Sequence, residues 1–516
     1  MTDTDFAKEL PRRIVIVGDG VEAWLSAVIL QHRLAASGIL ITVLTEDASE
    51  PACPVVSAGP GFSKLFTQLG IDEFGAMRQC KGTYRLGTQY RDWNQHKRDY
   101  WHPYGICGAV VDGCDIFLIW HSERAHGRVL RPYQSYSLNW SACVAGNSPR
   151  STDTITPIQT ASAYGFHFER QSFVQLLKQH AADRGVEIVE DTLAGVSPNG
   201  RGGIAQVKTL SSGNLPAEFY IDCTGYRSAL LGRELEDPFI EWHSHLLCDS
   251  VVSGSSAGEG RLPPYSCSLG TSGGSCTTVR LTDQTYHSFN YSSHHCNEED
   301  TEAVMVASAG KHAVNNLSTK RYSVGRQTSF WKGNVLGAGT AACNVSPNDS
   351  SALSLTQHGI EMFLRFMPDR NRDQLVREQY NLRMTQVAES LRDFEQLRYH
   401  LSSREDSEFW KEGRSLPLSD KLVQTLALYS ECGFIDDIAL PHVTASDYYY
   451  VLTGNGRLPR RPSGTALAYS SDDANEVLRV IQKQNDATMV NLPLHEDFLK
   501  EVGVLAAIRP LSVTLE

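Results

Sequence analysis

The glycine-rich turn after the first apolar run is the stretch best suited to chemistry. Gly18, Gly20 and Ala23 form the pattern G-x-G-x-x-A within "IVIVGDGVEAWLSAVIL". In a dinucleotide-binding turn the first glycine allows the bend, the second lets backbone approach a diphosphate, and a small third residue lets helix and strand pack closely. The next helix adds its positive N-terminal end. The pattern predicts a diphosphate site. Asp19 and Glu22 weaken its potential, although both side chains can point into solvent without touching a phosphate.

An acidic residue at the end of the second strand usually binds a ribose hydroxyl in such a site. Glu46 and Asp47 both stand at the end of "ILITVLTED", residues 39–47. Either carboxylate alone is equally compatible with an ordinary solvated strand end. Glu46 is therefore the candidate ribose ligand, and Asp47 is the alternative.

Two further patterns resemble chemical motifs but have the wrong surroundings. "GTSGG" at 270–274 matches G-x-S-x-G, in which Ser272 would be a nucleophile on a strand-to-helix turn. Both flanks are strand-like, so we predict a hairpin turn without a catalytic serine. Four histidines lack the i, i+4 spacing and the cysteine partners of a zinc site, so we predict no metal site there. They are His243, His245, His294 and His295.

The elements that must position these residues follow the order of a dinucleotide-binding fold. Residues 14–18 are short, β-branched and bounded by glycine, which predicts a buried parallel strand. A helix over 21–36 and a strand over 39–47 complete a βαβ unit, the context that the glycine motif requires. Further buried strands are predicted at 217–225 and at the start of 333–366, each ending in a turn of small residues.

The distribution of elements predicts a mixed α/β fold in two parts. Sheet elements are spread over the first 350 residues, including a helix followed by a strand at 167–190 and alternating β-type stretches at 245–295. Beyond about residue 353 the pattern is mostly helical. We therefore predict one interwoven nucleotide-binding lobe over 1–350 and a mainly helical lobe over 351–516.

The composition bears on partners and on compartment. The chain has 516 residues, 41% hydrophobic and 21% charged, which is typical of a soluble globular enzyme. Its net charge of −12 gives no electrostatic reason to expect nucleic acid or a membrane surface as partner. The first residues contain no apolar signal region, and the 12 cysteines form no C-x-x-C pair. We therefore expect a cytoplasmic protein with free thiols.

Six stretches, in order along nearly the whole chain, together resemble the flavin-dependent tryptophan halogenase family. No single stretch is decisive, but six in the right order identify the chain as a member. The first contains the glycine turn and Trp24, and the fifth ends in an aromatic helical signature. The stretches are "IVIVGDGVEAWLSA", "FHFERQSFVQLLKQHAADRGVEIV", "IDCTGYRSALLG" followed by "LLCDSVV", "VLGAGTAACNVSPNDSSAL", "RDFEQLRYHLSSREDSEFW" and "YVLTGNGRLP".

The resemblance implies an FAD-binding Rossmann-like lobe with an inserted β-sheet substrate region and a mostly helical C-terminal lobe that completes the substrate pocket. It implies reduced FAD from a separate flavin reductase. With oxygen and halide, this yields hypohalous acid, which reaches a lysine beside an aromatic substrate, assisted by a glutamate. The further matched cofactor positions are Gly225, Gly339, Ala341 and Ala342. A homodimer is an expectation by analogy alone.

The position of the family's lysine is occupied by Arg85. The family segment "GTFKLGIRFxDW" aligns without a gap with "GTYRLGTQYRDW" at 82–93. Arginine has a pKa above about 12, so it is neither a nucleophile toward hypohalous acid nor a proton donor near neutrality. It offers a fixed, forked cation that binds an anion: halide, carboxylate or a peroxide-derived species.

Four other positions on the same reaction path also depart from the family. The glutamate of "PLES" matches Asp349, which is one methylene shorter. The "WxWxIP" segment, which discourages ordinary monooxygenation, matches residues 275–281, and both tryptophans are absent. The strap "GVGE" beside the flavin has become "VVSAG" at 55–59, without its glutamate. A substrate-stacking tryptophan has become Tyr448.

Such clustered departures inside a consistent fold indicate a changed function. Three functions are compatible with the sequence. The first is a flavoenzyme acting on an indole or similar aromatic group, with halogenation altered or replaced by oxygenation, in which Arg85 binds the anion and Asp349 is the acid/base group. The second is an ordinary halogenase that tolerates the replacements. The third is a non-catalytic partner or binding subunit of an active relative.

Overall fold

A six-stranded sheet carries the glycine turn. The computed structural model describes residues 10–46, 53–95, 99–152, 163–347, 351–367, 374–435, 438–441 and 443–505. The strand order is β10-β2-β1-β14-β23-β22, parallel except for β22. The strands are β1 (Arg13–Val17), β2 (Leu40–Leu44), β10 (Glu187–Val189), β14 (Phe219–Asp222), β22 (Trp331–Lys332) and β23 (Val335–Gly337).

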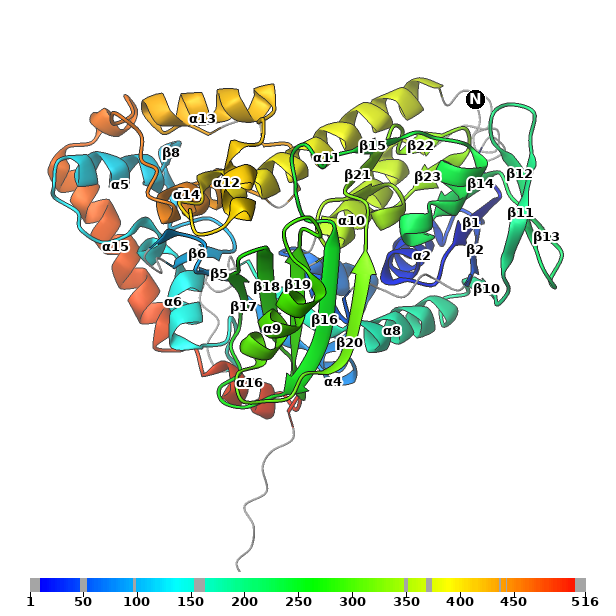
Figure 1. The fold of residues 1–516 in the computed structure, drawn as a ribbon, viewed down its shortest axis with the longest axis horizontal. Helices are drawn as coiled ribbons and strands as arrows, with labels where there is room; N and C mark the ends of the chain where they lie inside the picture. Colours follow the sequence, from blue (N-terminus) through cyan, green and yellow to red (C-terminus); the bar gives the residue numbers. More distant parts are fainter. Residues whose placement is uncertain are drawn as a thin grey trace, which may run out of the picture.

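The predicted βαβ unit at the start of the chain is confirmed. Helix α2 (Val21–Leu34) joins β1 to β2, and its residues 23–30 are all buried. A helix that is apolar on nearly every side must be covered on several faces. It packs against α8 (Arg170–Ala182) and α10 (Ser351–Arg365), which come from distant parts of the sequence (Figure 1).

A second, seven-stranded sheet lies beside this lobe in the lower half of Figure 1. Its order is β20-β16-β19-β18-β17-β5-β6, and only the pair β17–β5 is parallel. Two strands from residues 87–103 thus join five strands from residues 250–321. The strands are β5 (Gly87–Arg91), β6 (Tyr100–Pro103), β16 (Ser250–Ala257), β17 (Ser266–Gly270), β18 (Gly274–Arg280), β19 (Gln284–Tyr291) and β20 (Asn315–Arg321).

Four smaller sheets complete the β structure. The first has the order β3-β9-β4, with both pairs antiparallel. It consists of β3 (Val55–Ala58), β9 (Gly165–Glu169) and β4 (Thr83–Arg85). The others are β11 (Leu193–Pro198) with β12 (Ile204–Thr209) and β13 (Asn214–Pro216), β15 (Phe239–Glu241) with β21 (Gly325–Gln327) and β24 (Cys343–Asn344), and β7 (Val110–Val111) with β8 (Cys114–Asp115).

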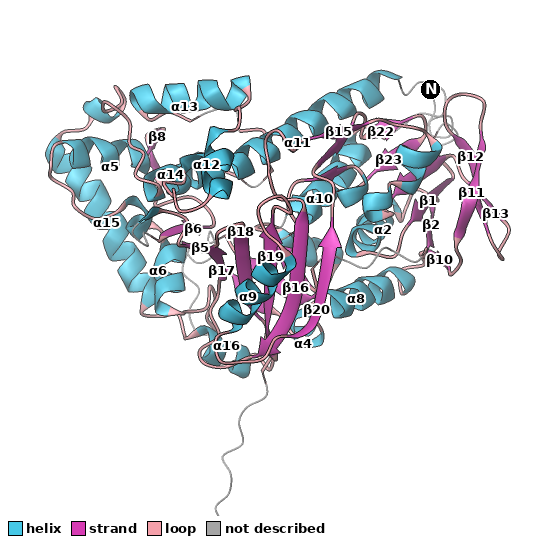
Figure 2. Cartoon of the chain, viewed as in Figure 1, coloured by secondary structure: helices cyan, strands magenta, loops and turns pink. Residues whose placement is uncertain are grey.

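In the described residues beyond 350, the regular elements are helices, as predicted. Figure 2 shows α12 to α15 gathered with α5 and α6 away from the Rossmann-like sheet, whereas α10 packs against α2. The long helix α11 (Gln374–Leu401) runs from that sheet to the helical region (Figure 1). The remaining helices are α3 (Phe62–Leu69), α4 (Glu73–Gln79), α5 (Ile116–Ala125), α6 (Leu138–Ala145), α9 (Glu298–Ala309), α12 (Glu408–Ser415), α13 (Asp420–Cys432), α14 (Ala445–Gly454), α15 (Ser471–Met489) and α16 (His495–Glu501).

The structure refines two of the local predictions. The segment at 167–190 begins as strand β9, and α8 starts only at Arg170, because Glu169 caps it by accepting from the amides of Gln171 and Ser172. The "GTSGG" turn is a hairpin, since Gly270 pairs with Ser275 across β17 and β18, and Ser272 is exposed at its tip. In the described part of the chain, no helix is both long and apolar enough to span a membrane.

Candidate active site

Three parallel strands end in register at one edge of the six-stranded sheet. Val17 pairs with Asp222, and Asp222 pairs with Gly337. This edge, outside the carboxyl ends of the strands, is where open α/β sheets bind nucleotides. The predicted cofactor residues follow these strands: Gly18, Gly20 and Ala23 after β1, Gly225 in the turn after β14, and Gly339, Ala341 and Ala342 in the turn after β23.

The backbone of these turns has room only for glycine at two positions. Gly18 has φ +137°, and a Cβ there would lie 2.3 Å from the carbonyl oxygen of Cys223. Gly339 has φ +58°, and a Cβ there would lie 2.4 Å from Cγ of Glu22. Gly20 begins α2 without a side-chain cap, so no side chain competes for the first amides of the helix. The turn offers the close backbone approach and the amides that a diphosphate needs.

The two acidic residues of the turn differ in orientation. Asp19 accepts a hydrogen bond from Nε1 of Trp24 at 2.8 Å, which holds the Asp19 carboxylate against the first turn of α2. Glu22 is half-buried, and its Oε2 lies 3.1 Å from where a Cβ on Gly20 would stand. Because Gly339 has no side chain, Cγ of Glu22 lies where a Cβ on Gly339 would stand. A diphosphate on this turn would meet one like charge.

Glu46 lies just beyond β2 and is 4% exposed. Its Oε1 accepts from Nη1 of Arg227 at 3.0 Å, while its buried Oε2 has no hydrogen-bond partner in the described part of the chain. Burial raises the pKa of Glu46, and the Arg227 guanidinium opposes that shift. An orphaned acceptor at this place fits a ribose hydroxyl. Asp47 lies outside the described residues. The edge therefore fits the diphosphate and ribose of FAD, although the negative charge of Glu22 would repel the diphosphate.

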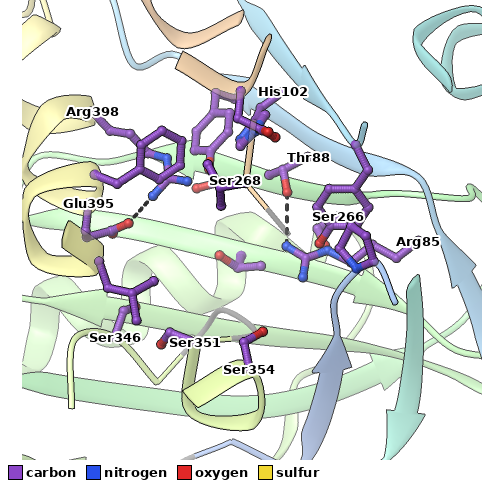
Figure 3. Close-up of a pocket in the computed structure, with 18 of the residues that line it drawn as sticks. Arg85, Thr88, His102, Ser266, Ser268, Ser346, Ser351, Ser354, Glu395 and Arg398 are labelled. Atoms are coloured by element: carbon purple, nitrogen blue, oxygen red, sulfur yellow. Dashed lines mark hydrogen bonds and ion pairs between the residues drawn. The ribbon is translucent and has the colours of Figure 1, made fainter. Parts of the chain in front are cut away.

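A cavity of about 150 Å³ lies between the seven-stranded sheet and the helices α10, α11 and α14. Figure 3 shows charged and hydroxyl side chains entering it from opposite walls, with Arg85 and Thr88 on one side and Glu395 and Arg398 on the other. Its lining is rich in hydroxyl groups: Thr88, Tyr90, Tyr104, Ser266, Ser268, Ser275, Thr277, Ser346, Ser351 and Ser354.

Arg85 stands at the end of β4 and is 7% exposed. Its Nη2 donates to Oγ1 of Thr88 at 3.2 Å, and its Cζ lies 5.2 Å from the ring centre of Tyr104. Its Nε and Nη1 are buried and have no hydrogen-bond partner among the described residues. Figure 3 shows the guanidinium pointing into the cavity. The sequence therefore located a cavity residue correctly, and its role stays a prediction.

A buried histidine and aspartate form a pair that sequence analysis missed. Nε2 of His102, on β6, lies 2.8 Å from Oδ1 of Asp447, on α14, and both residues line the cavity. Oδ2 of Asp447 accepts from the amide and hydroxyl of Thr444, which fixes the carboxylate at the start of α14. Burial lowers the pKa of His102, although Asp447 opposes the shift. The ring is therefore neutral near pH 7, and because a carboxylate only accepts, Nε2 carries the proton.

The opposite wall belongs to one face of α11. Val387, Leu391 and Phe394 follow the i, i+4, i+7 spacing of a helix face and line the cavity together. Arg398 lies 4.6 Å from the ring centre of Phe394 and forms an ion pair with Glu395. Phe394 presents its ring to the cavity, whereas the predicted substrate residue Tyr448 packs edge-on behind it, with ring centres 4.9 Å apart.

Strand β18 forms the middle of the cavity. Ser275 and Thr277 line it, and both belong to the segment 275–281 that the sequence analysis matched to the family's tryptophan motif. The cavity continues to Ser346 and Ser351, which flank the loop after the Gly339 turn. Asp349, the predicted acid/base group, stands between these two serines in the sequence and is outside the described residues. One cavity thus connects the predicted flavin loop with Arg85.

The chain matches known proteins over nearly its full length. The family model described as tryptophan halogenase matches residues 13–470. The chain belongs to the tryptophan halogenase family. Tryptophan 6-halogenase ThaL of Streptomyces albogriseolus is 25% identical, with 95% of this chain and 98% of ThaL covered. Tryptophan 6-halogenase SttH of Streptomyces toxytricini is 27% identical, with coverage of 96% and 98%.

Solved structures of flavin-dependent halogenases share the fold. Xcc4156 from Xanthomonas campestris has a TM-score of 0.89 at 23% identity, covering 97% of this chain and all of the other. BrvH from Brevundimonas sp. BAL3 has a TM-score of 0.87 at 22% identity, covering 95% and 99%. The predicted mixed α/β fold is confirmed. Membership of this halogenase family implies FAD as cofactor, and the named homologues halogenate tryptophan.

Proposed function

We propose that this halogenase-family chain is a flavin-dependent oxidoreductase acting on an indole-like or other aromatic substrate. It would use reduced FAD from a flavin reductase together with oxygen, and halogenation would be altered or replaced by a monooxygenase-type oxygenation. The continuity of the cavity carries this proposal: Ser346, Thr277 and Arg85 line one space. Bound FAD would supply the electrons that activate oxygen.

Arg85 supports a changed reaction. A lysine can react with hypohalous acid or give up a proton, whereas a guanidinium stays charged and only donates hydrogen bonds. Arg85 is also fixed by Thr88 and Tyr104, so it positions an anion and does not carry a reactive group. Ser275 and Thr277 line the same cavity, within the segment that lacks the two tryptophans of the family motif.

His102 and Asp447 supply a proton acceptor in this proposal. With Nε2–H donating to Asp447, the neutral ring keeps Nδ1 as an acceptor, so it can take a proton from a substrate hydroxyl or ring carbon. Asp349 remains the acid/base group that the sequence suggests. Tyr448 would act on the substrate only through Phe394, whose ring it supports.

The sheet edge would hold the cofactor. The amides after Gly20 would bind the diphosphate, and Oε2 of Glu46 would accept from the ribose. The turn from Gly339 to Ala342 would lie against the flavin on the side of the cavity. These residues bind and orient the cofactor, and the walls of the cavity limit access of bulk water.

The test is a product analysis. The purified chain is incubated with reduced FAD, oxygen, bromide and indole, and the products are read by mass spectrometry. The proposal predicts an oxygen mass shift that depends on the chain and on FAD. A bromine isotope pattern as the main product would instead identify an ordinary halogenase.

A non-catalytic binding role is the second candidate, and Glu22 favours it. Its carboxylate lies between Gly20 and Gly339, where a diphosphate would have to approach. A purified protein that is colourless and takes up no added FAD supports this role. A yellow protein with a flavin spectrum contradicts it.

A further inference from the structure

We propose that the cavity binds an aromatic carboxylic acid with the carboxylate on Arg85 and the ring against α11. This inference rests on the proposed function, since it names the substrate class of the same site. It adds an anion subsite on β4, at the place where the family pattern has a lysine.

The first argument is the incomplete coordination of a buried cation. Arg85 is 7% exposed, and only its Nη2 has a partner, the hydroxyl of Thr88. Among the described residues, no carboxylate forms an ion pair with it. A buried charge without a partner carries a desolvation penalty that an anion removes. The open Nε and Nη1 therefore call for an anionic ligand in the cavity.

The polar groups around Arg85 do not supply that anion, because each has another partner. His167 is held between the hydroxyls of Ser57 and Ser266, at 3.0 and 3.1 Å. Burial lowers its pKa well below the usual value, and Arg85 adds to the shift, so the ring is neutral. Asp447 bonds His102, and Glu395 bonds Arg398 on the far wall.

The second argument is the shape of the vacant donors. A guanidinium has two edges, each with a pair of N–H donors, and Thr88 uses one hydrogen of Nη2. One edge therefore stays complete, and a planar carboxylate matches it with two parallel hydrogen bonds. A halide has one acceptor atom, so it does not form two parallel hydrogen bonds with this edge. An amine would be repelled.

The third argument is the opposite wall. Val387, Leu391 and Phe394 form an apolar face, and Leu355 from α10 adjoins the same space. The volume of about 150 Å³ is similar to that of a protein cavity that takes up benzene. A ligand with a ring at one end and a carboxylate at the other can contact the apolar face of α11 with its ring and bind Arg85 with its carboxylate. Halide alone would leave the apolar wall uncovered.

The experiment measures binding by calorimetry with two pairs of probes, benzoate against benzamide and indole-3-carboxylate against indole-3-carboxamide. Wild type should bind each acid about tenfold to a hundredfold more tightly than its amide, the range of a hydrogen-bonded charge pair. Arg85→Met should abolish this preference. Arg85→Lys should keep part of it, because the charge remains but the fork is lost. The control Arg479→Met removes an exposed arginine paired with Glu476 and should change nothing.

Two binding results overturn the inference: amides that bind as tightly as the acids, or an acid preference that survives Arg85→Met. Thermal unfolding of Arg85→Met checks the fold, and we expect an unchanged or higher Tm, because an unpaired buried charge is removed. Binding needs no flavin, so the result is separate from catalysis. If the acids bind but reduced FAD and oxygen yield no product, the proposed function fails and the subsite stands. If only neutral indole is oxidised, the subsite fails and the function stands.

Discussion

Glu22→Gln should tighten the binding of FAD by about tenfold. Oε2 of Glu22 lies 3.1 Å from the Cβ position of Gly20, so a phosphate oxygen hydrogen-bonded to this turn would lie about 5 Å from the carboxylate. Two like charges at about 5 Å repel by about 3 kcal/mol at an effective dielectric constant of about 20. Glu22 is only half-buried, and screening reduces this to about 1.4 kcal/mol, a factor of about ten in Kd.

The assay is a titration of the purified chain with oxidised FAD, followed by quenching of flavin fluorescence. Glu190→Gln is the matched control, because it removes the same charge from an exposed ion pair with Lys178 and should leave the Kd unchanged. The difference between wild type and Glu22→Gln should shrink as salt is added, since the repulsion is electrostatic. Equal affinities at low salt, or weaker binding by Glu22→Gln, would refute the placement of this carboxylate beside the diphosphate.

Three further predictions concern the reaction and the fold. Arg85→Lys should not restore bromination of indole, because the other departures from the family pattern remain; a bromine isotope pattern would contradict this. Acid should destabilise the fold, because burial lowers the pKa of His287 and of His495 to about 4. Below pH ~6.5 the unfolded chain binds protons that the folded chain does not, so the free energy of unfolding should fall by about 1.4 kcal/mol per histidine by pH ~5.5. Urea titrations at several pH values check this prediction. His495→Gln should make the free energy of unfolding depend less steeply on pH, and an unchanged dependence would contradict the prediction. Gly18→Ala should lower the free energy of unfolding by at least about 2 kcal/mol more than Gly38→Ala does. Both glycines have positive φ, but only a Cβ at Gly18 would meet a backbone oxygen, at 2.3 Å. Equal denaturation midpoints of the two variants would contradict this prediction.

The parts of the fold set by local pattern could be predicted from the sequence. The apolar run of β1, the glycine turn and the apolar helix α2 follow from residue type and periodicity. The edge where Gly18, Gly225 and Gly339 meet follows from the parallel order of their strands, which the repeated strand-and-turn pattern indicates. Arg85 could be located because its segment aligns without a gap. The division at residue 350 stays a prediction.

The parts set by distant contacts could not be predicted. His102 and Asp447 are 345 positions apart, and only the packing of β6 against α14 brings them together. The orientation of Glu22 depends on the missing side chain of Gly339, far along the chain. Phe394 faces the cavity in place of Tyr448 because of the rotation of α11 and α14 about their axes, which the motif alone does not fix. The spacing of Glu395 and Arg398 on one helix was a signal that could have been used.

The most direct test of the central claim is an oxygen-labelling experiment. The chain is incubated with FAD, a flavin reductase, NADH, bromide and indole-3-carboxylate under isotopically labelled oxygen gas, and the products are read by mass spectrometry. We predict a product that carries one labelled oxygen atom and no bromine, and its loss in Arg85→Met. A brominated product from the wild-type chain, or no product from a chain that has bound FAD, would contradict the account.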